Sequence, residues 1–114
     1  RSPKAHDEVL ELSSYLKRES GISIAEVAFL EVDQPDIPSG IRSCVEQGAT
    51  DVHLLLHFLN SGRHVLEDVP RILSAEEAKY PDVRFHRTPF VGSHPGFPGF
   101  LLEILNFSLG SRTA

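Results

Sequence analysis

Three short apolar runs, separated by helix-length amphipathic stretches, are the feature that most limits the fold of this chain. The runs cover residues 23–30, 52–59 and 83–91, and Pro89 closes the third early. Their near-continuous apolar character is typical of strands buried on both faces. Strands that alternate with helices pair in parallel through right-handed crossovers. We therefore expect an α/β fold with a parallel sheet and helices on both faces.

Capping residues and prolines predict four helices around these strands. Ser2 before Pro3 is typical of an N-cap followed by proline at the first helical position, and Gly21 is a helix stop. Asp36 is a similar start signal, and Gly48 a similar stop. The helices are expected from Pro3 to Gly21, from Asp36 to Gly48, over 65–80 with a break at Pro70, and from Pro98 to Phe107 before a frayed tail over 108–114.

Length, composition and charge limit the function classes. The 114 residues fit one domain, 1–114, and no apolar run approaches the ~20 residues of a membrane span. A net charge of −5 without a basic cluster argues against a nucleic-acid partner. The single cysteine, Cys44, cannot form an intrachain disulfide, which is compatible with a reducing, cytoplasmic location. We expect a soluble protein that acts on neither membranes nor nucleic acids.

The chain opens on a helix with no strand before it, which is unusual for a doubly wound sheet. Three strands covered by four helices would also make a thin sheet. We therefore expect a first strand upstream of residue 1. In doubly wound order it would lie between the first two visible strands, and without it their backbone groups would stay unpaired.

The residues best suited to chemistry follow the strands, because sites in open parallel sheets form at the carboxyl ends. Glu31 follows the first strand, the loop Asn60-Ser61-Gly62-Arg63-His64 follows the second, and Gly92-Ser93-His94-Pro95 follows the third. A histidine and a carboxylate at neighbouring strand ends can bind a divalent metal or transfer protons near neutral pH. A helix start at His64 would favour its neutral, metal-binding form. Gly62 would let the backbone turn close to a ligand.

Each of these residues also has a simpler interpretation. Glu31 could cap the next helix, His94 could be an ordinary loop residue, and His64 could be a surface residue. Asp68, one turn after His64, could orient its ring or cap the helix near Pro70. We expect His53, within a strand, to be a core or interface histidine. No P-loop, dinucleotide or CxxC motif is present.

Taken together, these segments resemble the small sirohydrochlorin chelatases of the CbiX/SirB type. The matching stretches cover nearly the whole chain, and Gly62-Arg63-His64 followed by Asp68-Val69-Pro70 is the most specific. The others are Ala28-Phe29-Leu30-Glu31 with Pro35, Gln47-Gly48-Ala49, Phe58-Leu59 and Gly92-Ser93-His94-Pro95. The family begins with a strand ending in His-Gly-Ser-Arg, and Arg1 resembles the arginine of that motif.

The resemblance implies a chelatase-like, flavodoxin-like fold, usually in homodimers. It implies insertion of Co²⁺ or Fe²⁺ into sirohydrochlorin, in cobalamin or siroheme biosynthesis, without a prosthetic group. His64 would hold the metal, and His64 and Glu31 would accept protons. Asp68 would orient the ring of His64. Substrate-binding residues would include Asn60, Gly62, Arg63 and His94, with Arg87 or Lys4 as further carboxylate anchors.

Two other functional classes stay open at this point. The same residues could bind a metal or tetrapyrrole without turnover, as a carrier module. Alternatively, the chain could be a flavodoxin-like interaction domain in which the six histidines are incidental. Turnover of sirohydrochlorin separates the enzyme from the carrier. Stabilisation by Co²⁺ separates both from the interaction domain. Histidine and carboxylate ligands suit cobalt, iron and nickel alike, so they do not select the metal.

Overall fold

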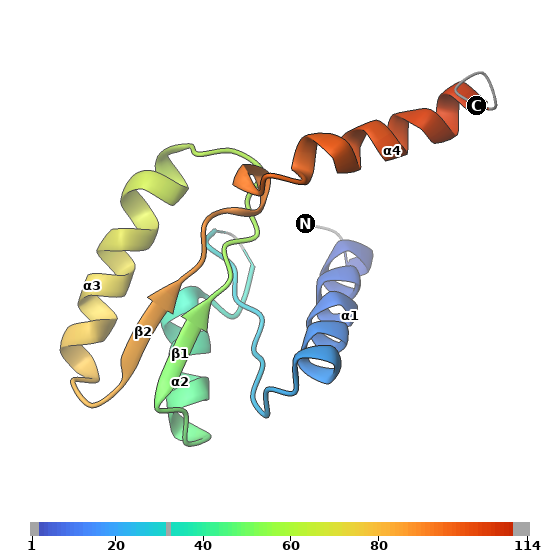
Figure 1. Cartoon of the computed structure of the whole chain (residues 1–114). Helices are drawn as coiled ribbons and strands as arrows, with labels where there is room; N and C mark the ends of the chain where they lie inside the picture. The colour runs from blue at the N-terminus through green and yellow to red at the C-terminus, as the bar shows by residue number, and fades with distance from the viewer. Residues whose placement is uncertain (1–2, 32, 111–114) are drawn as a thin grey trace.

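The computed structural model describes residues 3–31 and 33–110, apart from the side chain of His64. Figure 1 shows a small sheet with two helices beside it, a first helix that lies apart from the sheet and a last helix that extends away from it. The elements are, in chain order, α1 (Pro3–Ser20), α2 (Ile37–Glu46), β1 (Asp51–Leu54), the π-helical turn η1 (His64–Asp68), α3 (Val69–Lys79), β2 (Arg84–Arg87), the 3₁₀ turn η2 (Val91–Ser93) and α4 (Phe97–Leu109).

The sheet pairs β1 with β2 in parallel, which confirms the expected α/β class. Asp51 lies opposite Arg84, and His53 opposite His86. Both strands are shorter than the apolar runs that predicted them. The regular ladder ends because Pro89 has no N–H, while the Thr88 hydroxyl accepts the hydrogen bond of the Leu56 amide at 3.1 Å.

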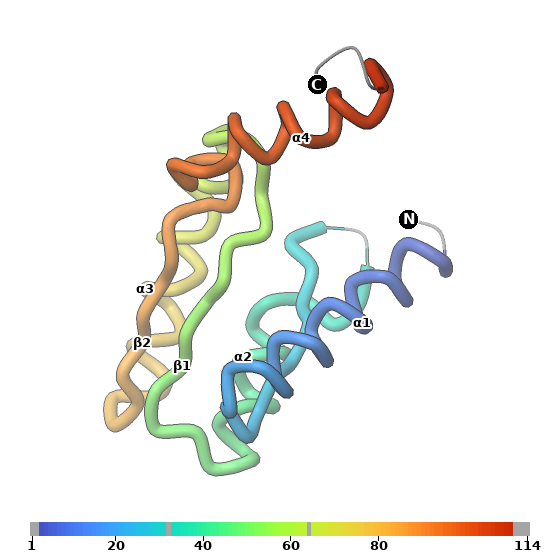
Figure 2. The backbone as a smooth tube through the Cα atoms, turned by 45° about the vertical axis from the view of Figure 1, so that its right-hand side comes forward, coloured from blue at the N-terminus to red at the C-terminus, as the bar shows by residue number. Residues whose placement is uncertain are grey.

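Residues 23–30 are extended but do not form the expected strand. Their described backbone makes only one isolated bridge, between Phe29 and Asp36, and has no ladder with β1. Figures 1 and 2 show the segment running in the same direction as β1, on the side away from β2. Apolar sequence predicted an extended conformation, but a strand also requires a partner. The expectation of another strand between this segment and β1 stays a prediction.

The four helices occur where capping chemistry placed them. Gly21 follows α1 with a φ of +80°, and Asp36 caps α2 by accepting a hydrogen bond from the Ser39 amide at 2.9 Å. The expected short first turn before the main helix is η1, and the change to α3 falls between Asp68 and Val69, so Pro70 lies in the first turn of α3. Ser2, the expected cap of α1, lies outside the described residues. The tail prediction was wrong at its start, since α4 continues through Leu109.

The buried core is small and lies between α2, α3 and the strands. Element contacts join α3 to both α2 and β2. The buried apolar side chains are Phe29, Ile41, Val52, Leu56, Val69 and Leu73. Glu76 on α3 is also buried, with 2% of its surface exposed. The strands are thus anchored from α3, while their carboxyl ends continue into the loops that carry the candidate residues.

Neither α1 nor α4 buries a residue completely. Figures 1 and 2 agree that α4 leaves the body at the carboxyl ends of the strands and extends away from it. The radius of gyration is 16.6 Å, against about 13 Å for a compact domain of this length. Within the described chain, no helix has the length and apolar character needed to cross a bilayer.

Candidate functional site

Beyond the ends of β1 and β2, the two chain segments stay joined by a line of hydrogen bonds that we call the seam. It consists of four bonds: Thr88 N–Leu54 O (2.9 Å), Leu56 N–Thr88 Oγ1 (3.1 Å), Val91 N–Leu56 O (3.0 Å) and Gly92 N–Phe58 O (3.0 Å). The seam carries the pairing of the strands toward their loops. It therefore holds the candidate loops 60–64 and 92–96 beside each other at the carboxyl ends of the strands.

The first candidate loop is exposed and ends in a helix start. Asn60, Gly62 and Arg63 are all exposed. The Gly62 carbonyl accepts hydrogen bonds from the amides of Val65 and Leu66, both at 3.1 Å, which begins the helical run. His64 is the first residue of η1, and the sequence predicted a helix start at this position. Its side chain lies outside the described part of the structure, so its predicted orientation toward a cleft and Glu31 stays a prediction.

Arg63 makes a weak, exposed ion pair. Its side chain is 80% exposed, and its Nε lies 3.5 Å from a Glu67 oxygen, one helical turn along the chain. An exposed pair of this kind contributes about 0–1 kcal/mol. A substrate carboxylate could therefore replace Glu67 at little cost.

Asp68 does not cap α3, which was one of its two sequence interpretations. It occupies the N-cap position in helical conformation, without a capping hydrogen bond from its side chain. Its Oδ1 instead lies 3.5 Å from Arg71 Nη2, and its side chain is 25% exposed. The other interpretation, in which Asp68 orients His64, is untested and remains a prediction.

Glu31 is exposed and follows the extended segment, as expected. It is not the cap of the next helix, because Asp36 has that role. Hydrogen bonds from Ser39 hold the pKa of Asp36 below its ordinary value. The Glu31 carbonyl accepts a hydrogen bond from the Asp33 amide at 2.6 Å. Glu31 lines neither of the two cavities described below.

His94 lies beside the larger of two open cavities near the strand ends. Its Nδ1 accepts a hydrogen bond from the Gly96 amide at 2.8 Å. The proton of the neutral ring is then on Nε2, which can donate to a ligand. The cavity measures about 580 Å³. Its lining is mainly apolar and includes Leu55, Phe90, Phe97 and Phe100.

The smaller cavity, of about 310 Å³, shares Thr88, Pro89, Phe90 and Ser93 with the larger one. Val65, Leu66 and Pro70 contribute from the η1–α3 side. Arg87, one of the carboxylate anchors that the resemblance implied, also lines it. Asn60, Gly62 and Arg63 line neither cavity.

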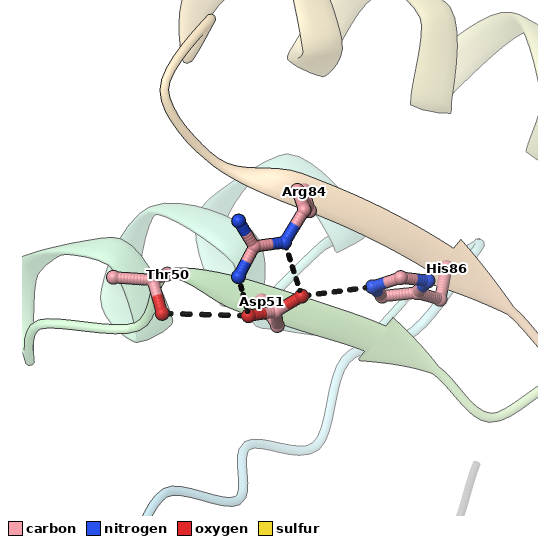
Figure 3. Close-up of polar contacts among 4 residues, drawn as sticks. All are labelled: Thr50, Asp51, Arg84 and His86. Carbon is pink, nitrogen blue, oxygen red and sulfur yellow. Dashed lines mark hydrogen bonds and ion pairs between the residues drawn. The ribbon is translucent and has the colours of Figure 1, made fainter.

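A polar network on the sheet was missed by the sequence analysis (Figure 3). Arg84 donates to both carboxylate oxygens of Asp51, at 2.9 and 2.7 Å, and His86 Nε2 lies 3.0 Å from Asp51 Oδ1. Hydrogen bonds from Arg84 and then His86 lower the pKa of Asp51 strongly. His53 stacks on His86 with ring centroids 4.4 Å apart. His53 is exposed, so its expected place in the core was wrong, while the alternative place at an interface stays a prediction.

This network begins at the amino ends of the strands, so it does not belong to the candidate site. The pairing spans 33 residues of sequence, which no local pattern indicates. The alternation of Asp51 and His53 with Val52 and Leu54 was the one available signal. Among the described side chains, which do not include that of His64, no group of three or more His, Cys, Asp or Glu could hold a metal.

Fold and loops together define a parallel α/β protein whose candidate site lies at the carboxyl ends of its strands. The model of the CbiX family matches residues 1–106. The chain therefore belongs to the CbiX family.

Individual relatives agree with this assignment. A sirohydrochlorin ferrochelatase of Priestia megaterium is 30% identical over 107 residues, which cover 93% of this chain and 40% of that protein. A sirohydrochlorin cobaltochelatase of Methanocaldococcus jannaschii is 30% identical over 77 residues, covering 68% and 54%. The solved structure of SirB from Bacillus subtilis with Fe³⁺ superposes with a TM-score of 0.82 at 25% identity, covering 94% of this chain and 42% of SirB. The chain thus spans about half or less of the length of these relatives.

Proposed function

We propose that this chain is a sirohydrochlorin chelatase unit that inserts Co²⁺ or Fe²⁺ into the tetrapyrrole. The observation that supports this best is the match to the CbiX family together with the seam, which joins loops 60–64 and 92–96 at one end of the sheet. The relatives named as sirohydrochlorin ferrochelatase and cobaltochelatase support the reaction class. The metal is a substrate here, and the proposal includes no prosthetic group.

The proposed mechanism follows from the chemistry of metal insertion. The macrocycle must lose its inner N–H protons while the metal exchanges water for ring nitrogens. A neutral His64 would hold the metal beside the ring. Once the metal has passed to the ring nitrogens, the freed imidazole nitrogen would accept one of the displaced protons. Glu31 would stabilise the cationic metal and accept another. Asp68 would accept a hydrogen bond from the His64 ring and fix its tautomer.

Substrate binding would combine charge with an apolar surface. Arg63 would bind a carboxylate of the tetrapyrrole in place of Glu67, and Arg87 would bind another from the smaller cavity. Asn60 and the backbone of Gly62 would contact the rim of the substrate. The apolar cavity of about 580 Å³ beside His94 would receive part of the hydrophobic face of the macrocycle.

A non-catalytic metal- or tetrapyrrole-binding module is the second candidate. The observation that favours it is the open, mainly apolar cavity of about 580 Å³ beside His94, which could hold a tetrapyrrole without turnover. Incubation of the protein with sirohydrochlorin and Co²⁺ decides between the two. Multiple turnovers, followed by the change in tetrapyrrole absorbance, support the chelatase. Stoichiometric binding of metal or tetrapyrrole without turnover supports the module.

The protein is further proposed to act as a homodimer in the cytoplasm. Cys44, the single cysteine, is compatible with that compartment. The dimer is supported by α4, which has one charged residue, Glu103, and no completely buried one. Six of its large apolar residues are 50–90% exposed: Phe100, Leu101, Leu102, Ile104, Leu105 and Phe107.

The exposed apolar area of α4 is close to the area that one partner buries in a standard interface. Taking roughly 200 Å² for each fully exposed Leu, Ile or Phe side chain, these fractions amount to about 700 Å². A standard interface buries about 800 Å² on each partner. The extension of α4 from the body (Figure 2) also contributes to the radius of gyration of 16.6 Å, which exceeds that of a compact domain of this length. A second copy that packs its own α4 here would cover this surface.

A further inference from the structure

The last bond of the seam brings two backbones unusually close together. The Gly92 amide donates to the Phe58 carbonyl at 3.0 Å. A Cβ atom built on Gly92 would lie 1.7 Å from the carbonyl oxygen of Leu59 and 2.6 Å from its carbonyl carbon. Real Cβ atoms essentially never lie within 3.0 Å of such neighbours. Any side chain at position 92 would therefore require one of the two backbones to move.

The requirement for glycine at this position is steric. The φ of Gly92 is not in the left-handed region, in contrast to Gly21, Gly48 and Gly110. An alanine could adopt the backbone conformation of Gly92 if there were space for its Cβ. The atoms that it would meet belong to the backbone of Leu59, so a change of side-chain rotamer cannot relieve the clash. Relief requires a displacement of at least about 1.3 Å, from 1.7 to 3.0 Å.

This displacement would fall next to the candidate site. Leu59 directly precedes Asn60, the first residue of the loop that ends at His64. On its far side, the loop is fixed by hydrogen bonds from the Val65 and Leu66 amides to the Gly62 carbonyl. The loop between these anchors is short and exposed. A shift of Leu59 will therefore be transmitted to Asn60, Gly62 and Arg63.

We propose that Gly92 is a positioning residue for metal insertion: its lack of a side chain lets the η2 turn lie against Leu59 and sets the place of the loop 60–64. The expected effect of Gly92 on catalysis rests on the proposed chelatase function. Its structural consequence, the placement of the loop, is independent of that function. Gly92 touches neither metal nor substrate in this account, and it acts only through the backbone of Leu59.

The kinetic test is the variant Gly92→Ala, with Gly99→Ala as the matched control. A Cβ on Gly99 would meet nothing within 4 Å. Misplacement of reacting groups by about 1 Å can lower a rate by about 10²-fold. We expect Gly92→Ala to lower kcat/KM for sirohydrochlorin by about that factor, mostly in kcat. Gly99→Ala should stay within twofold of the unaltered protein.

Amide hydrogen exchange supplies a readout that a general loss of stability would not produce. In Gly92→Ala, the Val65 and Leu66 amides should exchange at least tenfold faster than in the unaltered protein. The Arg84 amide, bonded to the Thr50 carbonyl at the other end of the strands, should keep its rate. Equal acceleration at all three amides would show a purely structural role and overturn the proposal. Unchanged exchange at Val65 and Leu66 would overturn it too.

The exchange experiment also separates this inference from the proposed function. If the unaltered protein does not turn over sirohydrochlorin, the chelatase proposal fails, while the exchange rates still decide the role of Gly92. If Gly92→Ala does not fold, hydrogen exchange in the unaltered protein still tests the role of Gly92. Its Gly92 amide should be protected and open with the same free energy as Val65 and Leu66. An unprotected Gly92 amide would contradict the proposal.

Discussion

Replacement of the buried Glu76 by leucine should stabilise the protein. Glu76 is 2% exposed, and within the described part of the chain its Oε1 has no hydrogen-bond partner. Its Oε2 lies 3.0 Å from Lys79 Nζ, but Lys79 is 59% exposed. A buried acceptor left unsatisfied costs about 1–3 kcal/mol, whereas a pair with an exposed lysine contributes at most about 1 kcal/mol. Leucine is similar in size to glutamate, and it removes both the unsatisfied acceptor and the weak pair with Lys79.

The net gain expected for Glu76→Leu is about 1–2 kcal/mol in the free energy of unfolding. Urea denaturation measures it directly, as a higher midpoint at an unchanged slope. In thermal unfolding, the midpoint should rise by about 4–8 °C. Glu77→Leu is the matched control, because the neighbouring Glu77 is exposed. That control should change stability by no more than about 0.5 kcal/mol.

A loss of stability in Glu76→Leu would refute this reasoning. A decrease of more than about 1 kcal/mol would mean that the carboxylate makes interactions in the folded protein that outweigh its burial. A gain of equal size in Glu77→Leu would mean that leucine stabilises α3 through helix propensity alone. Only a gain confined to position 76 supports the assignment of an unfavourable buried carboxylate.

Two further predictions concern a helix cap and the proposed dimer. Asp36→Ala should lower the urea midpoint at neutral pH because it removes the cap of α2. Hydrogen bonding lowers the pKa of Asp36 below its ordinary 3.8, so the stability from the cap is present above about pH 4 and is lost as the pH falls further. The midpoints of the variant and the unaltered protein should therefore converge in acid, and a constant difference between them would contradict the cap. Ile104→Glu should convert a dimer into a monomer in sedimentation equilibrium at about 10 μM, while Tyr15→Glu on α1 should not; a monomeric unaltered protein would refute the proposed α4 interface.

The helices could be predicted from sequence because their signals are local. Asp36 accepts a hydrogen bond from an amide three residues away, and Gly21 takes up a left-handed conformation that other residues rarely adopt. Strand ends were less predictable, because pairing depends on a partner far away in the chain. The apolar run 52–59 continues beyond Leu54, but the ladder stops where the Thr88 hydroxyl accepts in place of a backbone carbonyl and Pro89 has no N–H to donate. Among the described residues, the segment 23–30 makes only one isolated bridge, because no strand lies beside it to form a ladder.

The sequence placed the candidate loops through the general rule that sites in parallel sheets form at the carboxyl ends of strands. It did not predict the contacts that hold these loops in place. Loops 60–64 and 92–96 do meet at the carboxyl ends of β1 and β2. The close approach of Gly92 to Leu59 could not be predicted, because a glycine in a loop has the same sequence signal whether or not a backbone lies against it. The network of Asp51, Arg84 and His86 was equally hidden, since it depends on register.

The kinetics of metal insertion by His64→Ala test the central claim most directly. His57→Ala is the matched control, because His57 is an exposed histidine in the segment that precedes the same loop. The variants should be made in the full-length protein and assayed with sirohydrochlorin and Co²⁺, alongside their thermal unfolding midpoints. We predict that His64→Ala loses insertion while its midpoint stays within about 2 °C, and that His57→Ala keeps both. Unchanged turnover in His64→Ala would contradict the account.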